Sequence, residues 1–271
     1  MNHPVDVDSL VQSVRSTPKY AAIDVELVRA LVEQELAKGR NSRETVKAVR
    51  SKLHQIGGAY QQTPIDYAQF AHRLAALPHD LHSPELRAFC REAMSRHAST
   101  RERLGVLDDF YAQTLASIGP IHSLLDLACG LNPLALGWLP LAPDARILAC
   151  DIYTDMVDFL NAFFAHTSVN GRAFTCDLTR TLPDQPVQLA LLLKTIPCLE
   201  QVDKTIGQRL LSTIQAEHML VSFPAHSLGG RGKGMRENYA RHFQEITAGL
   251  LWKVQSFSFP GELVYLLSRQ E

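Results

Sequence analysis

The chain has 271 residues, of which 46% are hydrophobic, and its formal net charge at pH 7 is −1. This length and apolar content suit one large domain with a smaller one. The near-neutral charge excludes a strong overall attraction to nucleic acid, so any basic surface must be local.

The five cysteines include no Cys-x-x-Cys pair. We therefore expect reduced thiols and no metal site. The N-terminus lacks the charged lead and apolar core of a signal peptide, and no apolar run approaches the roughly 20 residues that span a bilayer. These features predict a cytoplasmic protein that makes no membrane contact.

Before residue 119 the apolar residues recur at helical spacing, and no strand is evident. The sequence Ser99-Thr-Arg-Glu102 has the form of a capping box, which predicts a helix that ends near Leu115. Four further helices are expected at 25–37, 42–56, 64–77 and 84–96. We place a helical domain at 1–96 and a second domain at 97–271.

The expected helix at 42–56 lies in a basic segment. Between residues 38 and 54 there are six lysines and arginines against one acid. One narrow stripe of the helical wheel holds Arg43, Lys47, Arg50 and His54. Such a stripe can contact phosphates while the apolar face packs, although an ordinary solvated helix face would have the same composition.

After residue 119 strands and helices alternate, which predicts an α/β fold with a doubly wound sheet. A closing antiparallel pair is expected near 250–257 and 262–268. The other strands are expected near 121–127, 146–151, 172–176, 187–193 and 217–223.

Three of these strands carry the signs of a nucleoside site at their ends. The first meets a turn at Gly130, the second ends in Asp151, and the third ends near Asp177. A glycine permits close backbone approach and an acid can accept from ribose hydroxyls, which leaves both NAD and S-adenosylmethionine (SAM) open. Because Gly130 stands without the other glycines of a pyrophosphate cradle, the pattern favours SAM and the Rossmann-like, seven-stranded SAM-dependent methyltransferase fold.

A glycine-rich basic segment, 227–234, follows the apolar run at 219–224. It is not a Walker A loop, because Gly234 rather than serine or threonine follows Lys233. Arg231 and Lys233 make it cationic, which suggests contact with a nucleic-acid substrate, although a plain surface loop would look the same.

The segment 191–198 lies at the end of the expected strand at 187–193, where some methyltransferases that act on nucleic-acid bases carry their catalytic motif. Two such motifs are missing from it. It lacks the Asn/Asp-Pro-Pro-aromatic motif of exocyclic amine methylation, and Cys198 lacks the later Thr-Cys partner of covalent pyrimidine methylation. Guanine N7 has a free lone pair and no proton, so its methylation requires alignment rather than a general base. The absence of a recognisable base therefore fits N7 methylation.

Several blocks together resemble the aminoglycoside-resistance 16S rRNA (guanine-N7) methyltransferases, which modify guanosine 1405 in the decoding site of the small ribosomal subunit. The similarity covers nearly the whole chain, and the blocks beginning at His97 and Ser227 are the most specific. The blocks that carry it are 52–60, 97–104, 125–135, 222–224, 227–235 and 262–266. The adenine-N1 type of resistance enzyme differs in these blocks.

The resemblance implies SAM as cofactor, S-adenosylhomocysteine (SAH) as product, and the following contacts. At the methionine end, Arg103 would pair with the carboxylate, His97, Ala98 and Ser99 would line the site, and Tyr60 would close over it. Along the nucleoside would lie Ala128, Gly130, Asp151, Ile152, Asp177 and Leu178. Leu193 and Lys194 would face the methyl group, with Lys194 positioning the flipped guanosine or its phosphate.

The resemblance also implies the intact 30S subunit as partner, with Arg43, Lys47 and Arg50 on rRNA phosphates, and a chain that needs only to be a monomer. The consequence would be resistance to 4,6-disubstituted deoxystreptamine aminoglycosides. Two other classes stay open: a small-metabolite methyltransferase with a helical lid, and a catalytically silent rRNA-binding assembly factor.

Overall fold

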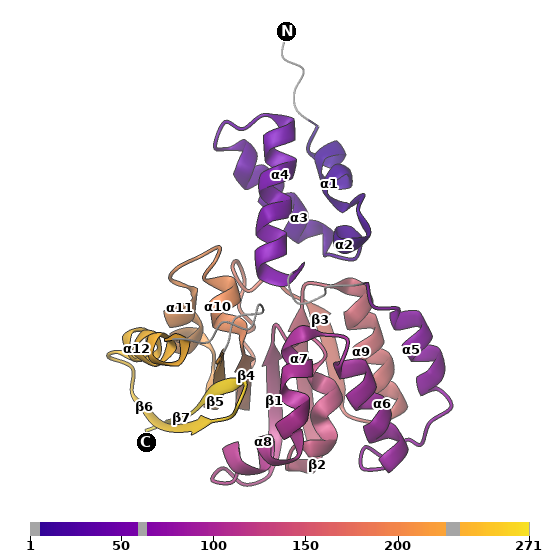
Figure 1. Ribbon diagram of the computed structural model, residues 1–271, viewed down its shortest axis with the longest axis vertical. Coiled ribbons are helices and arrows are strands. Elements are labelled where there is room, and N and C mark those ends of the chain that lie inside the picture. The colour runs from indigo at the N-terminus through magenta and orange to yellow at the C-terminus, as the bar shows by residue number, and fades with distance from the viewer. Residues whose placement is uncertain (1–5, 59–63, 226–233, 271) are drawn as a thin grey trace.

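The computed structural model describes residues 6–58, 64–225 and 234–270, and it contains a seven-stranded sheet of order β3-β2-β1-β4-β5-β7-β6. Strands β1 to β5 are parallel, and β7 runs antiparallel to its neighbours β5 and β6. This arrangement confirms the predicted fold (Figure 1). The strands are β1 (Ile121–Leu127), β2 (Leu141–Asp151), β3 (Gly171–Thr175), β4 (Val187–Leu193), β5 (Ala216–Pro224), β6 (Trp252–Ser258) and β7 (Glu262–Arg269).

Strand β2 begins five residues earlier than the sequence suggested. Leu141 pairs with Ile121, and the register then shifts before Arg146 pairs with Ser123. The segment between Leu141 and Arg146 contains a proline and an aspartate, so the first part of the strand lacks the apolar run by which strands were predicted.

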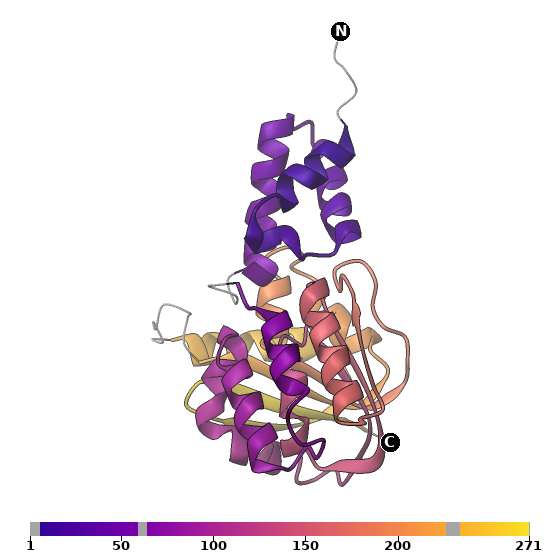
Figure 2. The ribbon, with the colours of Figure 1, turned by 90° about the vertical axis from the view of Figure 1, so that its right-hand side faces the viewer.

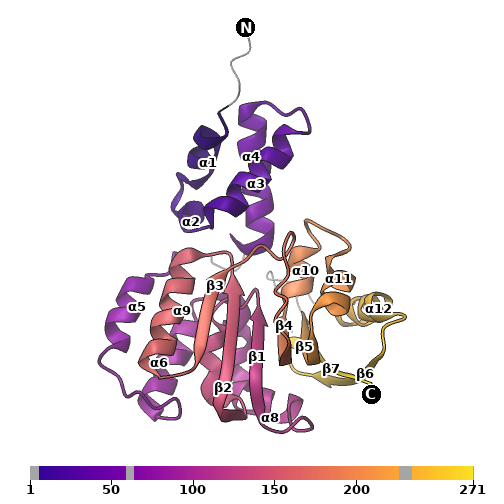
Figure 3. The ribbon, with the colours of Figure 1, turned by 180° about the vertical axis from the view of Figure 1, so that it is seen from behind.

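The sheet is covered on both faces because its strands are apolar on both faces. In β4, Leu189, Leu191 and Leu193 join one core while Ala190 and Leu192 join the other, as expected for side chains that alternate. The first core includes α5 (Tyr67–Leu74), α6 (Pro84–Met94), α8 (Leu107–Thr114) and α9 (Thr154–His166). The second includes α10 (Thr195–Leu199), α11 (Ile206–Thr213) and α12 (Met235–Thr247), as Figure 3 shows from behind.

The first four helices form a bundle that stands beyond the carboxyl ends of the strands (Figures 1 and 2). They are α1 (Val7–Arg15), α2 (Pro18–Ala21), α3 (Val25–Leu36) and α4 (Ser42–Leu53), and a π-helical turn η1 (His54–Gly58) continues α4. The sequence reading did not place α1 or α2. No helix in the described parts of the chain is long and apolar enough to cross a membrane.

Helices α5 and α6 pack with the sheet rather than with this bundle. The ring centroids of Tyr67 and Phe159 are 5.6 Å apart, and those of Phe70 and Phe89 are 5.7 Å apart. The helices up to η1 therefore pack in the N-terminal bundle, and those from α5 onward pack against the sheet. The expected domain boundary lay later, at residue 96. The reason is that the apolar faces of α5 and α6 are buried on the α9 side of the sheet.

A short backbone bridge fastens the bundle to the end of β2. Ile23 and Tyr153 form an isolated antiparallel bridge. The Asp24 amide donates to the Ile152 carbonyl at 2.9 Å, and the Thr154 amide donates to the Ala22 carbonyl at 2.8 Å. Because Ile23 is fully buried, this joint places the bundle directly against the strand ends.

The expected capping box at Ser99 and Glu102 is not formed. Helix α7 (Ala98–Arg103) has His97 at its N-cap, and a 3-10 turn η2 (Leu104–Val106) separates α7 from α8. The Glu102 carboxylate accepts from the Lys194 ammonium instead of from the backbone. The buried Lys194 ammonium requires a negatively charged partner. The Glu102 carboxylate therefore pairs with Lys194 and does not cap the helix. A capping box does occur at Asn41 and Glu44, at the start of α4.

Within the bundle, three cations surround the buried carboxylate of Glu35, whose side chain is 1% exposed. Lys38 and Lys52 approach it at 2.7 Å and Arg40 at 2.6 Å. Burial alone would raise the pKa of Glu35, but the hydrogen bonds from these three residues outweigh burial and lower it to about 2. Three of the six basic residues between 38 and 54 are thus held by one carboxylate.

Because the folded-state pKa of Glu35 is depressed, its ionised form stabilises the fold above about pH 4.5, and this contribution is lost as the pH falls toward 2. We expect Glu35→Gln to lower the free energy of unfolding by about 1–3 kcal/mol at pH 7. The difference from wild type should shrink between about pH 4.5 and 2. Denaturant titrations followed by circular dichroism at several pH values measure both effects.

The matched control is Glu33→Gln, an exposed acid on the same helix, which should change stability little at any pH. A Glu35→Gln penalty that stayed constant down to pH 2 would show that the carboxylate charge is not its source.

Candidate functional site

A cavity lies at the carboxyl ends of β1, β2, β3 and β4, beneath the turn η1. Ile56 and Gly57 of η1 form part of its wall, so the N-terminal bundle helps to close it. The remaining wall consists of His97, Ser99, Ala128, Cys129, Asp151, Ile152, Tyr153, Cys176, Asp177, Leu178, Thr179, Leu193, Lys194, Thr195, Cys198 and Leu199. The cavity therefore joins the ends of four strands to a segment from the bundle.

One end of the cavity carries two carboxylates on neighbouring strands. Asp151 accepts from the Gly130 amide at 2.8 Å and from the Ile152 amide at 2.7 Å, which fixes the carboxylate in place. Burial raises the pKa of Asp151, and these backbone hydrogen bonds oppose the rise. Each oxygen retains a lone pair for a further donor.

Asp177 is only half satisfied. Its Oδ1 accepts from the Thr179 amide at 2.9 Å and from the Thr179 hydroxyl at 2.6 Å. Its Oδ2 is buried and has no hydrogen-bond partner among the described residues. Buried polar atoms are almost always hydrogen-bonded, so this oxygen in the cavity wall suits a donor on a bound molecule.

The glycine turn is shaped by a histidine from α7. Gly130 has φ +52°, and a Cβ added there would lie 2.7 Å from the His97 Cε1. The Cβ side of Gly130 is therefore filled by the His97 imidazole, and close approach of the cofactor to the Gly130 backbone stays a prediction. Burial, followed by the charges of Arg101, Lys194 and Arg103, lowers the pKa of His97 to about 4, so its ring is neutral at pH 7.

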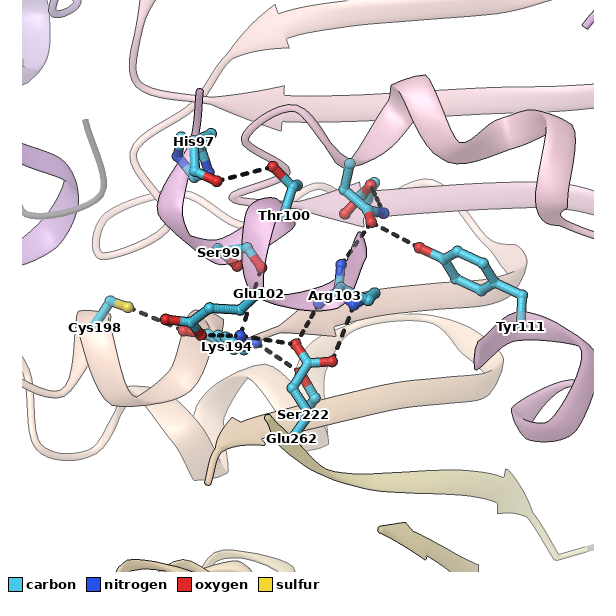
Figure 4. Close-up of polar contacts among 12 residues, drawn as sticks. His97, Ser99, Thr100, Glu102, Arg103, Tyr111, Lys194, Cys198, Ser222 and Glu262 are labelled. Carbon is cyan, nitrogen blue, oxygen red and sulfur yellow. Dashed lines mark hydrogen bonds and ion pairs between the residues drawn. The ribbon is translucent and has the colours of Figure 1, made fainter. Parts of the chain in front are cut away.

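The opposite end of the cavity is backed by a cluster of three buried charged residues, Arg103, Glu262 and Lys194, and the more exposed Glu102 (Figure 4). The Arg103 guanidinium donates to both Glu262 oxygens, from Nε at 3.0 Å and from Nη2 at 2.5 Å. The Lys194 Nζ lies 3.2 Å from Glu262 Oε1 and 2.5 Å from Glu102 Oε2. The side chains of Arg103, Glu262 and Lys194 are 0%, 3% and 2% exposed, so they are paired away from water.

The pairing determines how these groups ionise. Burial alone would raise the pKa of Glu262, but the charges of Arg103 and Lys194 and their hydrogen bonds outweigh it and lower the pKa. Burial alone would lower the pKa of Arg103, and the Glu262 charge reverses this and raises it. The Arg103–Glu262 pair is therefore ionised at neutral pH.

Behind the cluster, the network continues to the first strand. Arg103 Nη1 and the Tyr111 hydroxyl both donate to Asn132 Oδ1, at 2.9 Å and 2.7 Å. The Asn132 amide in turn donates to Asp126 Oδ2 at 2.7 Å. Burial raises the pKa of Asp126 to about 7. Asp126, which precedes the glycine turn, thus supports the site from the core and does not line the cavity.

The cavity brings together nine of the residues that the sequence nominated: His97, Ser99, Ala128, Asp151, Ile152, Asp177, Leu178, Leu193 and Lys194. Ala98, Arg103 and Gly130 are buried and are not among the residues that line the cavity. Since Glu262 takes the Nε and Nη2 of Arg103, a direct contact between Arg103 and a cofactor carboxylate stays a prediction. Tyr60, Arg231 and Lys233 lie outside the described residues.

Sequence reasoning missed the counter-charges Glu102 and Glu262, although both fall in blocks that carry the family resemblance. It also missed the wall formed by Ile56 and Gly57, because a π-helical turn has no periodic signature.

The basic stripe on α4 is only partly available for a partner. Arg43 and Lys47 are exposed. Arg50 instead caps the end of α1, donating to the Ser13 carbonyl at 2.5 Å. His54 Nδ1 lies 2.9 Å from the ammonium of Lys19. A contact of Arg50 or His54 with RNA stays a prediction that requires these bonds to open or to be shared.

The strand order, the carboxylates at the ends of β2 and β3, and the single glycine turn together define the class of protein. They describe a nucleoside-binding domain of the seven-stranded methyltransferase type.

Comparisons with known proteins narrow the class. The family model described as "Ribosomal RNA methyltransferase (FmrO)" matches residues 15–266. A 16S rRNA (guanine(1405)-N(7))-methyltransferase of Micromonospora echinospora is 32% identical over 265 residues, which cover 97% of each chain. One from Frankia casuarinae is 34% identical over 267 residues, 97% of this chain and 94% of that one. This chain belongs to the FmrO family of ribosomal RNA methyltransferases.

A solved structure agrees with this assignment. The 16S rRNA methyltransferase RmtF, in complex with SAH, is similar to this chain with a TM-score of 0.83 and 32% identity. The similarity covers 99% of this chain and 100% of RmtF.

The contact between Gly130 and His97 predicts the effect of a single methyl group. We expect Gly130→Ala to weaken SAM binding by about tenfold or more, because the Cβ collides with His97 and so displaces a wall residue. Isothermal titration calorimetry measures the affinity, and thermal unfolding checks that the variant folds.

Gly119→Ala is the matched control, since Gly119 also has positive φ (+66°) but has no atom within 4 Å of an added Cβ. It reports backbone strain alone. Equal loss of affinity in the two variants would contradict a role for the His97 contact.

Proposed function

We propose that this chain transfers the methyl group of SAM to N7 of the guanine at position 1405 of 16S rRNA. The observation that carries the proposal is the nucleoside cradle of Asp151 and Asp177 in a chain that is 32% identical, over nearly its whole length, to an enzyme named for this reaction.

The residues present fit SAM. The remaining lone pairs of Asp151 suit ribose hydroxyls, and the buried Oδ2 of Asp177 suits the amino group of adenine. The single close turn at Gly130 leaves no pyrophosphate cradle, which disfavours a dinucleotide. SAH in the similar RmtF structure supports the same assignment.

The chemistry requires little of the protein beyond alignment. When bound, SAM supplies an electrophilic methyl on a positively charged sulfur. Guanine N7 attacks with its lone pair, so no side chain has to remove a proton. Leu193 and Lys194 form the wall at the methionine end, and the Lys194 ammonium is held by Glu102 and Glu262. In this proposal Lys194 positions the guanosine, and the absence of a general base is expected.

The substrate is proposed to be the intact 30S subunit. The bundle stands beyond the carboxyl ends of the strands (Figure 2). Arg43 and Lys47 are exposed on it, so they can meet rRNA phosphates. Arg50, His54, Arg231 and Lys233 are proposed to add to this contact. A monomer acting on cytoplasmic ribosomes suffices, and the expected result is resistance to 4,6-disubstituted deoxystreptamine aminoglycosides.

Transfer of tritium from methyl-labelled SAM to purified 30S subunits tests substrate and surface together. We expect the wild type to label 30S subunits, and Lys47→Glu to reduce the initial rate by about tenfold at low salt, because the charge reversal repels the phosphate backbone. Affinity for SAM, measured by calorimetry, should stay within about twofold of wild type.

Lys253→Glu on β6 is the matched control, because it reverses an exposed lysine at the far edge of the sheet. Its rate should resemble that of the wild type. Labelling of 30S that was insensitive to Lys47→Glu would contradict the proposed surface. Binding of SAM without any labelling of 30S would favour the metabolite or assembly-factor alternatives.

A further inference from the structure

Glu102 occupies an unusual place between the solvent and the buried charge cluster. It lies in the last turn of α7, and its side chain is 33% exposed, whereas the Lys194 side chain that it contacts is 2% exposed. The 2.5 Å contact joins Glu102 Oε2 to Lys194 Nζ. Figure 4 shows the Glu102 carboxylate on the side of Lys194 away from Arg103.

Each of the two buried cations is paired with a carboxylate. Arg103 and Lys194 supply two positive charges, and Glu262 supplies one negative charge. Glu262 is engaged by two hydrogen bonds from Arg103 and lies further from Lys194, at 3.2 Å, than Glu102 does. Glu102 is therefore the carboxylate that neutralises Lys194. His97, the other nearby basic side chain in the wall, is neutral at pH 7.

The charge of this wall matters because the two forms of the cofactor differ in charge. SAM has a positively charged sulfur, whereas SAH has a neutral one. Lys194 lines the cavity together with Leu193 and Ser99. An uncompensated ammonium in this wall would oppose SAM and leave SAH unaffected, and such a charge acts strongly in a site of low dielectric.

We infer that Glu102 is a positioning residue that holds and neutralises the Lys194 ammonium, so that the site binds the cationic methyl donor in preference to the neutral product. The same carboxylate keeps the Lys194 side chain folded into the cavity wall. The inference rests on the proposed function only in taking SAM as the cofactor, and it holds whichever substrate receives the methyl group.

The test is the ratio of dissociation constants, Kd of SAH divided by Kd of SAM, measured by isothermal titration calorimetry at low salt. Glu102→Gln should lower this ratio by about three- to tenfold, because it leaves the ammonium uncompensated. Lys194→Met should raise the ratio, because it removes the ammonium and leaves the negative charge of Glu102 without its partner, which favours the cationic SAM. Glu102→Gln combined with Lys194→Met removes one charge of each sign and should return the ratio to near the wild-type value.

Glu217→Gln is the matched control, since Glu217 is an exposed acid near the start of β5, at the opposite edge of the sheet from the cavity. It should leave the ratio unchanged. A merely structural role for Glu102 would weaken SAM and SAH by the same factor and would overturn the inference. A double variant whose ratio stayed as low as that of Glu102→Gln would also overturn it.

These measurements use the cofactor and its product alone, so they separate this inference from the proposed function. If 30S subunits were never methylated, the order of the four ratios would still be decided by calorimetry. If the ratios did not follow the predicted order, the role of Glu102 would be wrong, and the proposal that the chain methylates 30S subunits would still stand.

Discussion

The rest of the site depends on the burial of the Glu262 carboxylate between Arg103 and Lys194. Buried charges are strongly unfavourable unless they are paired with good geometry, and here one carboxylate meets two cations from distant parts of the chain. Arg103 ends α7, Lys194 links β4 to α10, and Glu262 begins β7. The pairing therefore holds three separate elements in one arrangement at the carboxyl edge of the sheet, and the cavity wall follows from that arrangement.

Hydrogen bonds and ion pairs extend from the Glu262 carboxylate toward the core on one side and toward solvent on the other. Inward, Arg103 binds Asn132, which binds Asp126, so the glycine turn after β1 is tied to the cluster. Outward, Lys194 binds Glu102 at the edge of the solvent. The left-handed backbone of Lys194, with φ +61°, is retained because its amide also donates to the Ser222 carbonyl at 3.0 Å. Strain, charge and turn geometry thus meet at the Lys194 side of the cavity.

The N-terminal bundle is connected to this site by contacts rather than by proximity alone. The bridge between Ile23 and Tyr153 fastens the bundle to a residue of the cavity wall, and η1 adds Ile56 and Gly57 to that wall. A partner that binds the exposed side of the bundle therefore acts on an element that also contacts the cofactor cavity. This connection holds the bundle in a fixed position relative to the cavity wall.

The sequence predicted the sheet well because buried parallel strands are apolar on both faces and end at acids or glycines. The strand at 187–193 and the acids Asp151 and Asp177 were found in this way. Side-chain partners were harder to predict. Glu102 has the spacing of a capping residue, yet it pairs with Lys194, which is 92 residues away in the chain. Arg50 has the position of a phosphate contact, yet it caps α1, a helix that the periodicity did not reveal. Such outcomes depend on which groups are buried together, and a single sequence does not contain that information.

The most direct test of the account is the position and chemistry of the methyl group on the RNA. Purified protein, SAM and intact 30S subunits are incubated, and the 16S rRNA is then cleaved with borohydride and aniline and mapped by primer extension. The account predicts one SAM-dependent stop, at guanosine 1405, the position named in the similar enzymes. Cleavage at another guanosine, or methylated RNA without cleavage, would contradict the assignment of guanine N7 at this position.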